Sequence, residues 1–189
     1  MRIAHSLAAF ALLGLVSAPA IAEDVAVGHF DQVELDGGGH VTVKYGPTQK
    51  VTLLKGSTEY TKFTIRQGNQ LEIKSCPWHC PADYTVDVEI VTPFINAASI
   101  DGGGHIVIAG GFPAQHDLAA AIDGGGSLNL TALSADVVNA AIDGGGHIDI
   151  TAKQRLHAAI DGGGLITYHG DPQVMSAIDG GGTVTRAMK

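Results

Sequence analysis

A four-residue string, Asp-Gly-Gly-Gly, occurs six times in this sequence and supplies a carboxylate each time. The copies begin at Asp36, Asp101, Asp123, Asp143, Asp161 and Asp179. Carboxylate oxygens are the ligands that Ca²⁺ prefers, so the last five aspartates are candidate calcium ligands. Two arguments favour a purely structural role for these aspartates. The string lacks the Gly-Gly-x-Gly-x-Asp spacing of calcium-binding β-rolls. An Asx turn, in which the aspartate accepts hydrogen bonds from the following glycine N–H groups, needs no ligand at all.

Histidines accompany some copies of the string. His40, His105 and His147 each follow an aspartate by four residues, and aspartate with histidine suits Zn or Cu. In a straight strand the two side chains of one copy would lie about 13 Å apart, so only a tight turn at the glycines would let them share an ion. The simpler interpretation is a solvated polar residue at the start of a strand. His105 and His147 remain candidates for a binding surface.

The two cysteines lie in one short segment, Cys76-Pro77-Trp78-His79-Cys80-Pro81. An even cysteine count in an exported chain predicts a disulfide between Cys76 and Cys80. The alternative is a soft-metal site in which two thiolates and His79 bind Cu(I) or Zn. The C-x3-C-P spacing resembles the copper-loading motif of periplasmic copper chaperones, although over only six residues.

Neither catalysis nor nucleic-acid binding is expected. The sequence has no G-x-S-x-G, H-E-x-x-H or phosphate-binding loop, and the repeats give each copy the same chemistry rather than one distinct constellation. We therefore predict no catalytic residues and no cofactor, apart from the calcium already considered. The formal net charge of −8 excludes a basic surface that would displace counterions from nucleic-acid phosphates.

The spacing of the copies predicts the elements that carry them. The last five copies lie 22, 20, 18 and 18 residues apart, which is typical of a solenoid with one copy per coil. Apolar residues alternate before a copy, as in Val138, Ala140 and Ile142, and again after it, as in Leu128 and Leu130. Period two indicates strands with one buried face. The predicted fold is all-β: a parallel β-helix with coils of about 18–22 residues and a less regular β amino-terminal half.

The outward positions of these strands suggest a surface for binding. Ala121, Ala141, Ala159 and Ala177 form a flat stripe beside the aspartates, which a glycan, an envelope component or a second copy of the chain could approach closely. Aligned carboxylates on strands about 4.8 Å apart repel by roughly 1 kcal/mol per neighbouring pair in water. Bound cations would relieve that repulsion, as would side chains that fan outward into solvent.

The amino terminus has the features of an export signal. Arg2 precedes an apolar stretch from Leu7 to Val16, and Ala20-Ile21-Ala22 fits the cleavage rule, so residues 1–22 are predicted to be a signal peptide. No later run reaches about 18 apolar residues, so no membrane-spanning segment is expected in the mature chain. We expect residues 23–95 to form an amino-terminal β region or cap and residues 96–189 the repeat β-helix, together one domain in the periplasm, on the outer cell surface or secreted.

A family resemblance adds to this interpretation. The order Phe30-x2-Val33, Gly39-x-Val41-x-Val43, Leu71-x-Ile73 and Val86-x-Val88-x-Ile90-x2-Pro93, followed by repeated Gly-x-Ile, looks like the head GIN domain family. Members of this family are labelled autotransporter adhesins. The resemblance implies an exported, β-helix-like protein that acts in surface binding or adhesion. A periplasmic metal-binding protein using the aspartates, with or without the cysteine loop, is the alternative.

Overall fold

The computed structural model describes residues 22–188, where it contains fifteen β-strands and no helix. The expected signal peptide, except Ala22, lies outside the described residues. In chain order the strands are β1 Glu23–Val25, β2 Gln32–Asp36, β3 His40–Tyr45, β4 Lys50–Lys55, β5 Thr61–Arg66, β6 Gln70–Ser75, β7 Asp87–Thr92, β8 Ala97–Gly102, β9 His105–Ile108, β10 Gln115–Gly124, β11 Ser127–Gly144, β12 His147–Gly162, β13 Leu165–His169, β14 Gln173–Gly180 and β15 Thr183–Arg186. The all-β prediction is confirmed.

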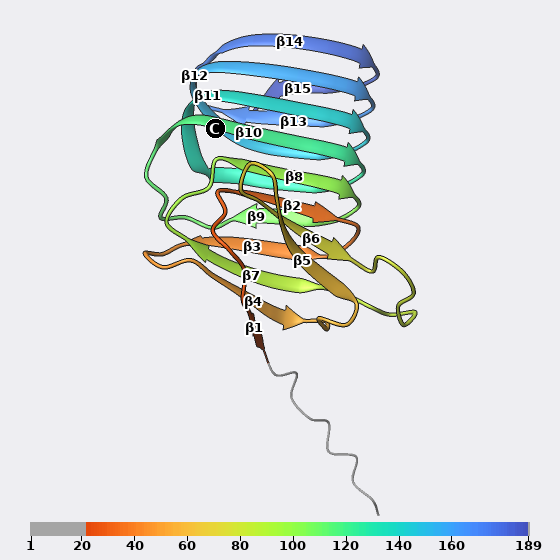
Figure 1. Ribbon diagram of the computed structural model, residues 1–189. Helices are drawn as coiled ribbons and strands as arrows, with labels where there is room; N and C mark the ends of the chain where they lie inside the picture. Colours follow the sequence, from red (N-terminus) through yellow and green to blue (C-terminus); the bar gives the residue numbers. More distant parts are fainter. Residues whose placement is uncertain (1–21, 189) are drawn as a thin grey trace, which may run out of the picture.

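The strands form two ladders that face each other across one core (Figure 1). The first ladder runs in the order β5-β6-β2-β8-β10-β11-β12-β14. The second ladder runs β1-β4-β7-β3-β9-β11-β12-β13-β15. The long strands β11 and β12 belong to both, because each begins in the second ladder and ends in the first. This is the stacked-coil arrangement of a parallel β-solenoid, as predicted.

The core consists of apolar columns that repeat from coil to coil. Ile100, Ile122, Ile142 and Ile160 lie in register along the first ladder, and each is at most 3% exposed. The alternation seen in the sequence therefore places the same residue type at the same depth in successive coils. Because parallel strands stack in register, each isoleucine packs on its equivalents above and below.

The amino-terminal half continues the solenoid with its coils out of chain order. The coil formed by β2 and β3 lies between the coil of β6 and β7 and the coil of β8 and β9. All of these pairings are parallel. The segment without the Asp-Gly-Gly-Gly string therefore contains regular coils as well as additional strands.

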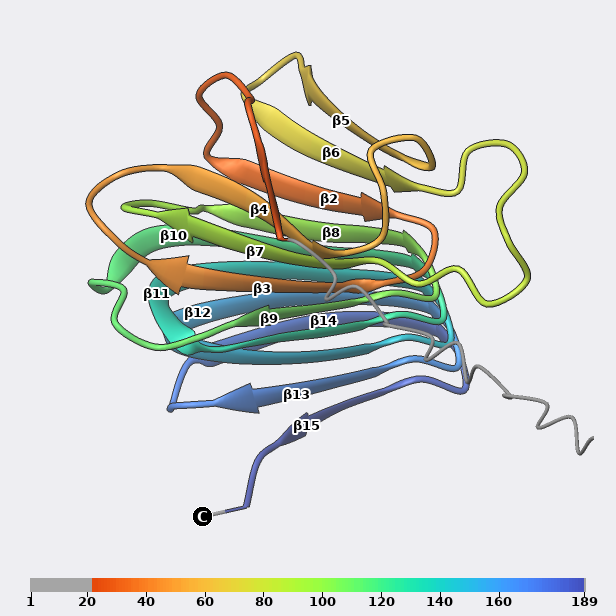
Figure 2. The ribbon, with the colours of Figure 1, turned by 90° about the horizontal axis from the view of Figure 1, so that it is seen from below.

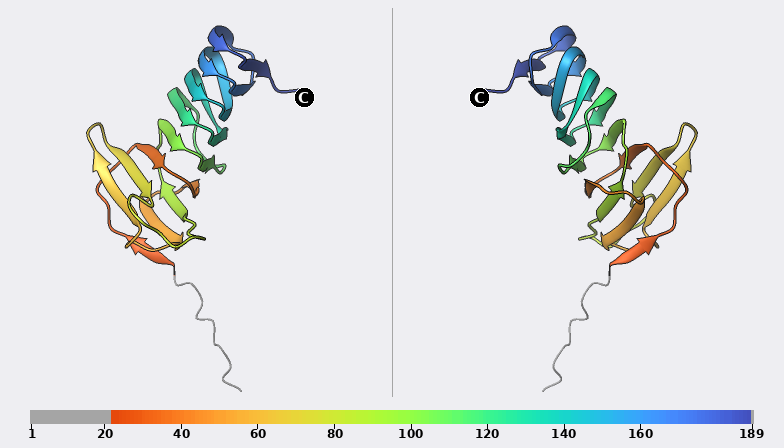
Figure 3. Two further views of the ribbon diagram at one scale, coloured as in Figure 1. Left: turned by 90° about the vertical axis from the view of Figure 1, so that its right-hand side faces the viewer. Right: turned by 90° about the vertical axis from the view of Figure 1, so that its left-hand side faces the viewer.

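Antiparallel strands cover the end of the solenoid nearest the amino terminus. β5 pairs antiparallel with β6, β4 pairs antiparallel with β7, and β1 pairs antiparallel with β4. The amino-terminal half therefore contains coils that are out of chain order and an antiparallel cap. At the opposite end, β14 and β15 form the last described coil (Figure 3).

The loop between β6 and β7 replaces the glycine turn in its coil. It projects from the edge of the solenoid at which the glycine turns lie (Figure 2). Cys76 and Cys80 form a disulfide within it, as predicted from the sequence. The alternative of two metal-binding thiolates is therefore wrong for this structure, because both sulfur atoms are used in the bond. Within residues 22–188, no helix has the length and apolar character needed to cross a membrane.

Candidate binding surface

Each Asp-Gly-Gly-Gly string ends a first-ladder strand and turns the chain into the second ladder. At Gly144 the backbone φ is 116°, and an added Cβ would lie 2.5 Å from the carbonyl oxygen of Gly124 in the neighbouring coil. A Cβ on Gly146 would lie 2.7 Å from Cγ2 of Ile122, whereas Gly145 has nothing within 4 Å. The first position therefore requires glycine because of its left-handed conformation and the nearby backbone of the next coil. The third position requires glycine because an isoleucine side chain of that coil lies close to it.

The hydrogen bonds of this turn run between coils. The N–H of Gly145 donates to the carbonyl of Gly124 at 2.9 Å, and the same bond recurs from Gly163 to Gly144. An Asx turn requires the aspartate carboxylate to accept from these N–H groups, so the Asx-turn prediction is wrong here. The neighbouring coil accepts the N–H of the second glycine, which leaves the carboxylate available at the surface.

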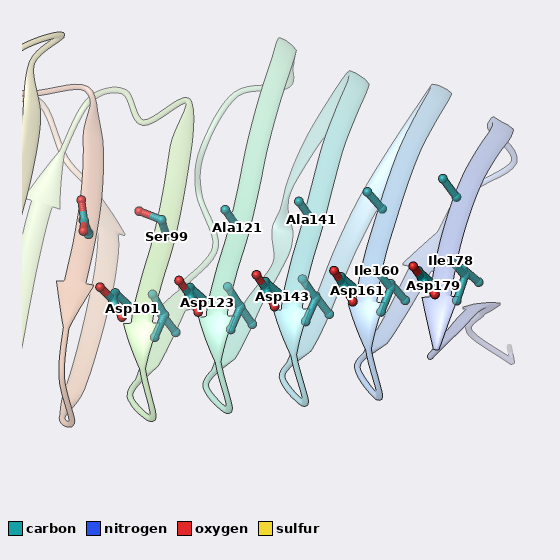
Figure 4. A pocket seen from close by; sticks show the side chains of 16 residues that line it. Ser99, Asp101, Ala121, Asp123, Ala141, Asp143, Ile160, Asp161, Ile178 and Asp179 are labelled. Atoms are coloured by element: carbon teal, nitrogen blue, oxygen red, sulfur yellow. The ribbon is translucent and has the colours of Figure 1, made fainter. Parts of the chain in front are cut away.

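The aspartates form one row along the outer face of the first ladder (Figure 4). Asp101, Asp123, Asp143, Asp161 and Asp179 are direct neighbours on successive strands. In the part of the chain that the structure describes, none of these five forms an ion pair. Their side chains lie in solvent, with only other carboxylates as neighbours along the row.

The row continues beyond these five and ends on a cation. Asp36 on β2 lies in register with Asp101 on β8, although 65 residues separate them in the sequence. On its other side Asp36 lies in register with Lys74 on β6 and forms an ion pair with it. The repeat spacing does not place Asp36 in the row, because β3 to β7 lie between the two coils in the sequence and conceal that they are neighbours.

A column of small side chains lies beside the row, two residues before each aspartate. It consists of Ser99, Ala121, Ala141, Ala159 and Ala177. On the other side of this column lie Ala119, Asn139, His157 and Met175, also in register. The small column is therefore the floor between the aspartates on one side and the longer side chains of Asn139, His157 and Met175 on the other. We call this feature the alanine–aspartate trough.

The trough is hollowed on both sides of its floor. A groove of about 690 Å³ follows the small column and the aspartate row from Glu34 to Asp179. A second groove of about 590 Å³ lies between the small column and the side chains of Asn139, His157 and Met175. Both grooves cross several strands, so an extended ligand would lie along the solenoid axis. Asn139, His157 and Met175 were missed in the sequence, because no repeated residue type marks their column.

Charged side chains close the trough at the capped end. Glu34 and Glu72 continue the small column on β2 and β6, and Arg66 on β5 forms an ion pair with Glu72. Burial raises the pKa of Glu34, and the carboxylates of Glu72, Asp36 and Asp101 raise it further, while Arg66 lowers it. The trough is therefore acidic along its length and meets Arg66 and Lys74 only at this end.

The candidate histidines lie on the other ladder, across the glycine turn from the aspartate row. The His40 and His105 rings lie 5.3 Å apart between centroids, and His147 Nε2 lies 2.8 Å from Asp149 Oδ2. These residues are outside the grooves that follow the small column. The structure thus separates the predicted histidine and alanine positions rather than joining them in one surface.

The geometry does not support the metal-binding alternative. In residues 22–188, no three histidine, cysteine, aspartate or glutamate side chains gather in an arrangement that would hold a metal ion. The aspartates share a row, with one carboxylate per coil. Calcium binding along this row stays an untested prediction.

Sequence comparison assigns the family. The family model described as "Putative auto-transporter adhesin, head GIN domain" matches residues 29–116 and 114–172. This chain belongs to that family. The resemblance seen in the sequence is therefore confirmed, and membership points to an adhesion-type protein at the cell surface or outside the cell. The family description names no enzymatic activity. A comparison with curated proteins finds no match.

A solved structure supports the same fold. A putative adhesin from Bacteroides fragilis has 17% sequence identity and a TM-score of 0.55, with 88% of this chain and 96% of that chain covered. A putative adhesin from Parabacteroides distasonis has 16% identity and a TM-score of 0.45, with the same coverage. The similarity to the Bacteroides fragilis protein shows that the two chains share a fold.

Proposed function

We propose that this GIN-domain protein is an exported, non-catalytic binding protein that holds an extended envelope glycan in the alanine–aspartate trough. The observation that carries the proposal is the trough itself, a continuous hollow with a floor of small side chains and a wall of unpaired carboxylates. Family membership supports an adhesion-type role. The predicted signal peptide supports export to the periplasm or beyond.

The chemistry of the two walls suits a polyhydroxylated chain. Ionised carboxylates act only as acceptors, so the aspartate row would accept hydrogen bonds from a succession of hydroxyl groups. Alanine side chains leave room for the apolar face of a sugar ring, and Asn139 and His157 offer polar partners on the opposite wall. Each coil presents the same aspartate and alanine, so a polymer with a repeating unit would meet the same contacts several times.

The repetition also argues against catalysis. A catalytic centre combines different groups around one reacting atom, whereas the aspartate row repeats one carboxylate per coil without a distinct partner. Several weak, equivalent contacts produce retention of a long ligand through multivalency.

A glycan array tests the proposal. We expect the wild-type chain to retain a subset of envelope-type polysaccharides. Ala141→Arg, which fills the floor of the trough with a long side chain, should abolish this signal. Asp143→Asn together with Asp161→Asn should weaken the signal at least tenfold, because two acceptor sites become amides that also donate.

A matched variant on the other ladder provides the control. Thr167→Arg places the same side chain on the outer face of β13, away from the trough, and should leave the signal unchanged. A signal that survives Ala141→Arg, or that Thr167→Arg removes equally, would contradict binding in the trough. An array in which no glycan binds would contradict the glycan ligand.

A further inference from the structure

The last described coil exposes side chains that every other coil buries. Ile178 on β14 belongs to the same column as Ile160, yet Ile178 is 44% exposed and Ile160 is 3% exposed. In the part of the chain that the structure describes, β14 pairs with β12 on one edge and with no strand on the other (Figure 1). Its outer edge therefore presents both unpaired backbone groups and the open core column.

The two ends of the first ladder differ in how their edges are protected. The edge strand β5 carries Lys62 and Arg66, and charged side chains are a common device against edge pairing. From Gln173 to Ile178, β14 has no charged residue and no proline. An edge of this kind is a template for pairing with another strand.

We propose that β14 pairs with β14 of a second copy of this chain, antiparallel and centred on Ser176, to form a two-fold dimer. The strand is self-complementary in this register. Val174 faces Ile178 of the second copy, so the half-buried Val174 and the exposed Ile178 cover each other twice across the two-fold axis. Gln173 faces Asp179 of the second copy, where the amide donates to the carboxylate.

Ser176, at the centre of the pairing, carries a hydroxyl group where the equivalent inward positions of the preceding coils have alanine. The inward positions equivalent to Ser176 are Ala120, Ala140 and Ala158 in the preceding coils. Two facing serines across a two-fold axis can hydrogen-bond to each other, as cross-strand hydroxyl pairs do. A serine at this position also suits an interface more than the dry interior that the alanines occupy.

Closure distinguishes the two-fold arrangement from a head-to-tail stack. In the two-fold pairing Asp179 lies opposite Gln173, so the two aspartate rows do not meet. A head-to-tail stack would place β14 on the Lys62 and Arg66 edge of β5 and would propagate without closing. The two-fold pairing closes after two copies and extends the first ladder through both.

The mass in solution tests the proposal directly. For the chain from Glu23 onward, analytical ultracentrifugation at tens of micromolar should give twice the mass of one chain. Ile178→Lys places a charge opposite Val174 within the buried pairing and should reduce the mass to that of a monomer. The matched control is Ile65→Lys on the edge strand β5, which should leave the dimer intact.

Cysteine cross-linking gives an independent readout that does not depend on how well the lysine variants fold. Facing residues of an antiparallel pair have Cα atoms about 4.5–5.5 Å apart, within the range of a disulfide. Mild oxidation of Ser176→Cys should therefore convert most chains to covalent dimers, whereas Thr64→Cys on β5 should convert few. A monomeric wild type, a dimer that withstands Ile178→Lys, or equal cross-linking of the two cysteine variants would each overturn the proposal.

Discussion

At the scale of single residues, the three glycines of each string have different roles. The first adopts a left-handed conformation against the backbone of the next coil, and the third lies against an isoleucine side chain. The second faces open space. The repeated sequence therefore conceals a difference that substitution can measure.

Gly144→Ala should destabilise the protein by about 2 kcal/mol or more, because alanine is strained at positive φ and its Cβ would contact the Gly124 carbonyl. Gly145→Ala should change the free energy of unfolding by less than about 0.5 kcal/mol. Urea unfolding followed by circular dichroism measures both. Equal losses in the two variants would contradict the assigned geometry.

The raised pKa of Glu34 makes the stability of the fold depend on pH. Its pKa is raised in the folded state, chiefly by burial. The folded chain therefore holds the Glu34 proton more tightly than the unfolded chain does. The stabilising contribution is complete below the usual carboxyl pKa and is lost as the pH rises through the raised value.

Glu34→Gln should therefore gain stability relative to wild type as the pH rises from 4 to 7. Thermal melts across that range measure the difference, because the amide does not titrate. A constant difference between the two proteins over this range would show that Glu34 does not contribute through its charge.

At the scale of elements, the first ladder aligns like charges that the glycine turns do not neutralise. The backbone hydrogen bonds of the turn run between glycines, so the carboxylates keep their full mutual repulsion apart from screening by solvent and salt. The row is compatible with the fold because it lies on the exposed face, where each pair costs only about 1 kcal/mol.

Asp143→Asn should stabilise the protein by roughly 2 kcal/mol at low ionic strength, because Asp143 has an aspartate neighbour on each side and each pair costs about 1 kcal/mol. The gain should shrink as salt is added. Asp83→Asn, at an exposed position outside the row, should show neither effect. Denaturant melts in low and high salt measure both variants, and a gain that salt leaves unchanged would contradict an origin in charge repulsion.

At the scale of the whole molecule, the solenoid has one capped end and one end at which a core column is exposed. In a stack of coils, each coil is stabilised mainly by its neighbours, so the same residue has different energetic importance at the middle and at the end. Ile142 is 2% exposed in the middle of the column, and Ile178 is 44% exposed in the last described coil.

Ile142→Ala should cost about 2–5 kcal/mol, as expected for a buried isoleucine truncated to alanine. Ile178→Ala should cost at least about 1 kcal/mol less when measured below micromolar concentration, where self-association contributes least. Urea titrations of both variants decide the question. Equal costs would indicate that the last coil is covered even in the isolated chain.

The local sequence was sufficient to predict the strands, the coil length and the stacking of the last five aspartates. Period-two alternation and a nearly constant repeat are properties of contiguous residues, and hydrophobic burial then fixes the register. The disulfide followed from the presence of only two cysteines. These predictions depend on short-range spacing, which one sequence contains in full.

The tertiary structure alone decided which distant residues meet. Asp36 joins the row and Lys74 ends it, because between β3 and β8 the chain forms the antiparallel strands β4 and β5 and the coil of β6 and β7. His105 lies on the ladder opposite Ala121, because a glycine turn separates β8 from β9. Asn139, His157 and Met175 become one wall of the trough only when three coils are stacked in register. Pairing between strands far apart in the chain depends on the path of the intervening segment, which no local pattern contains.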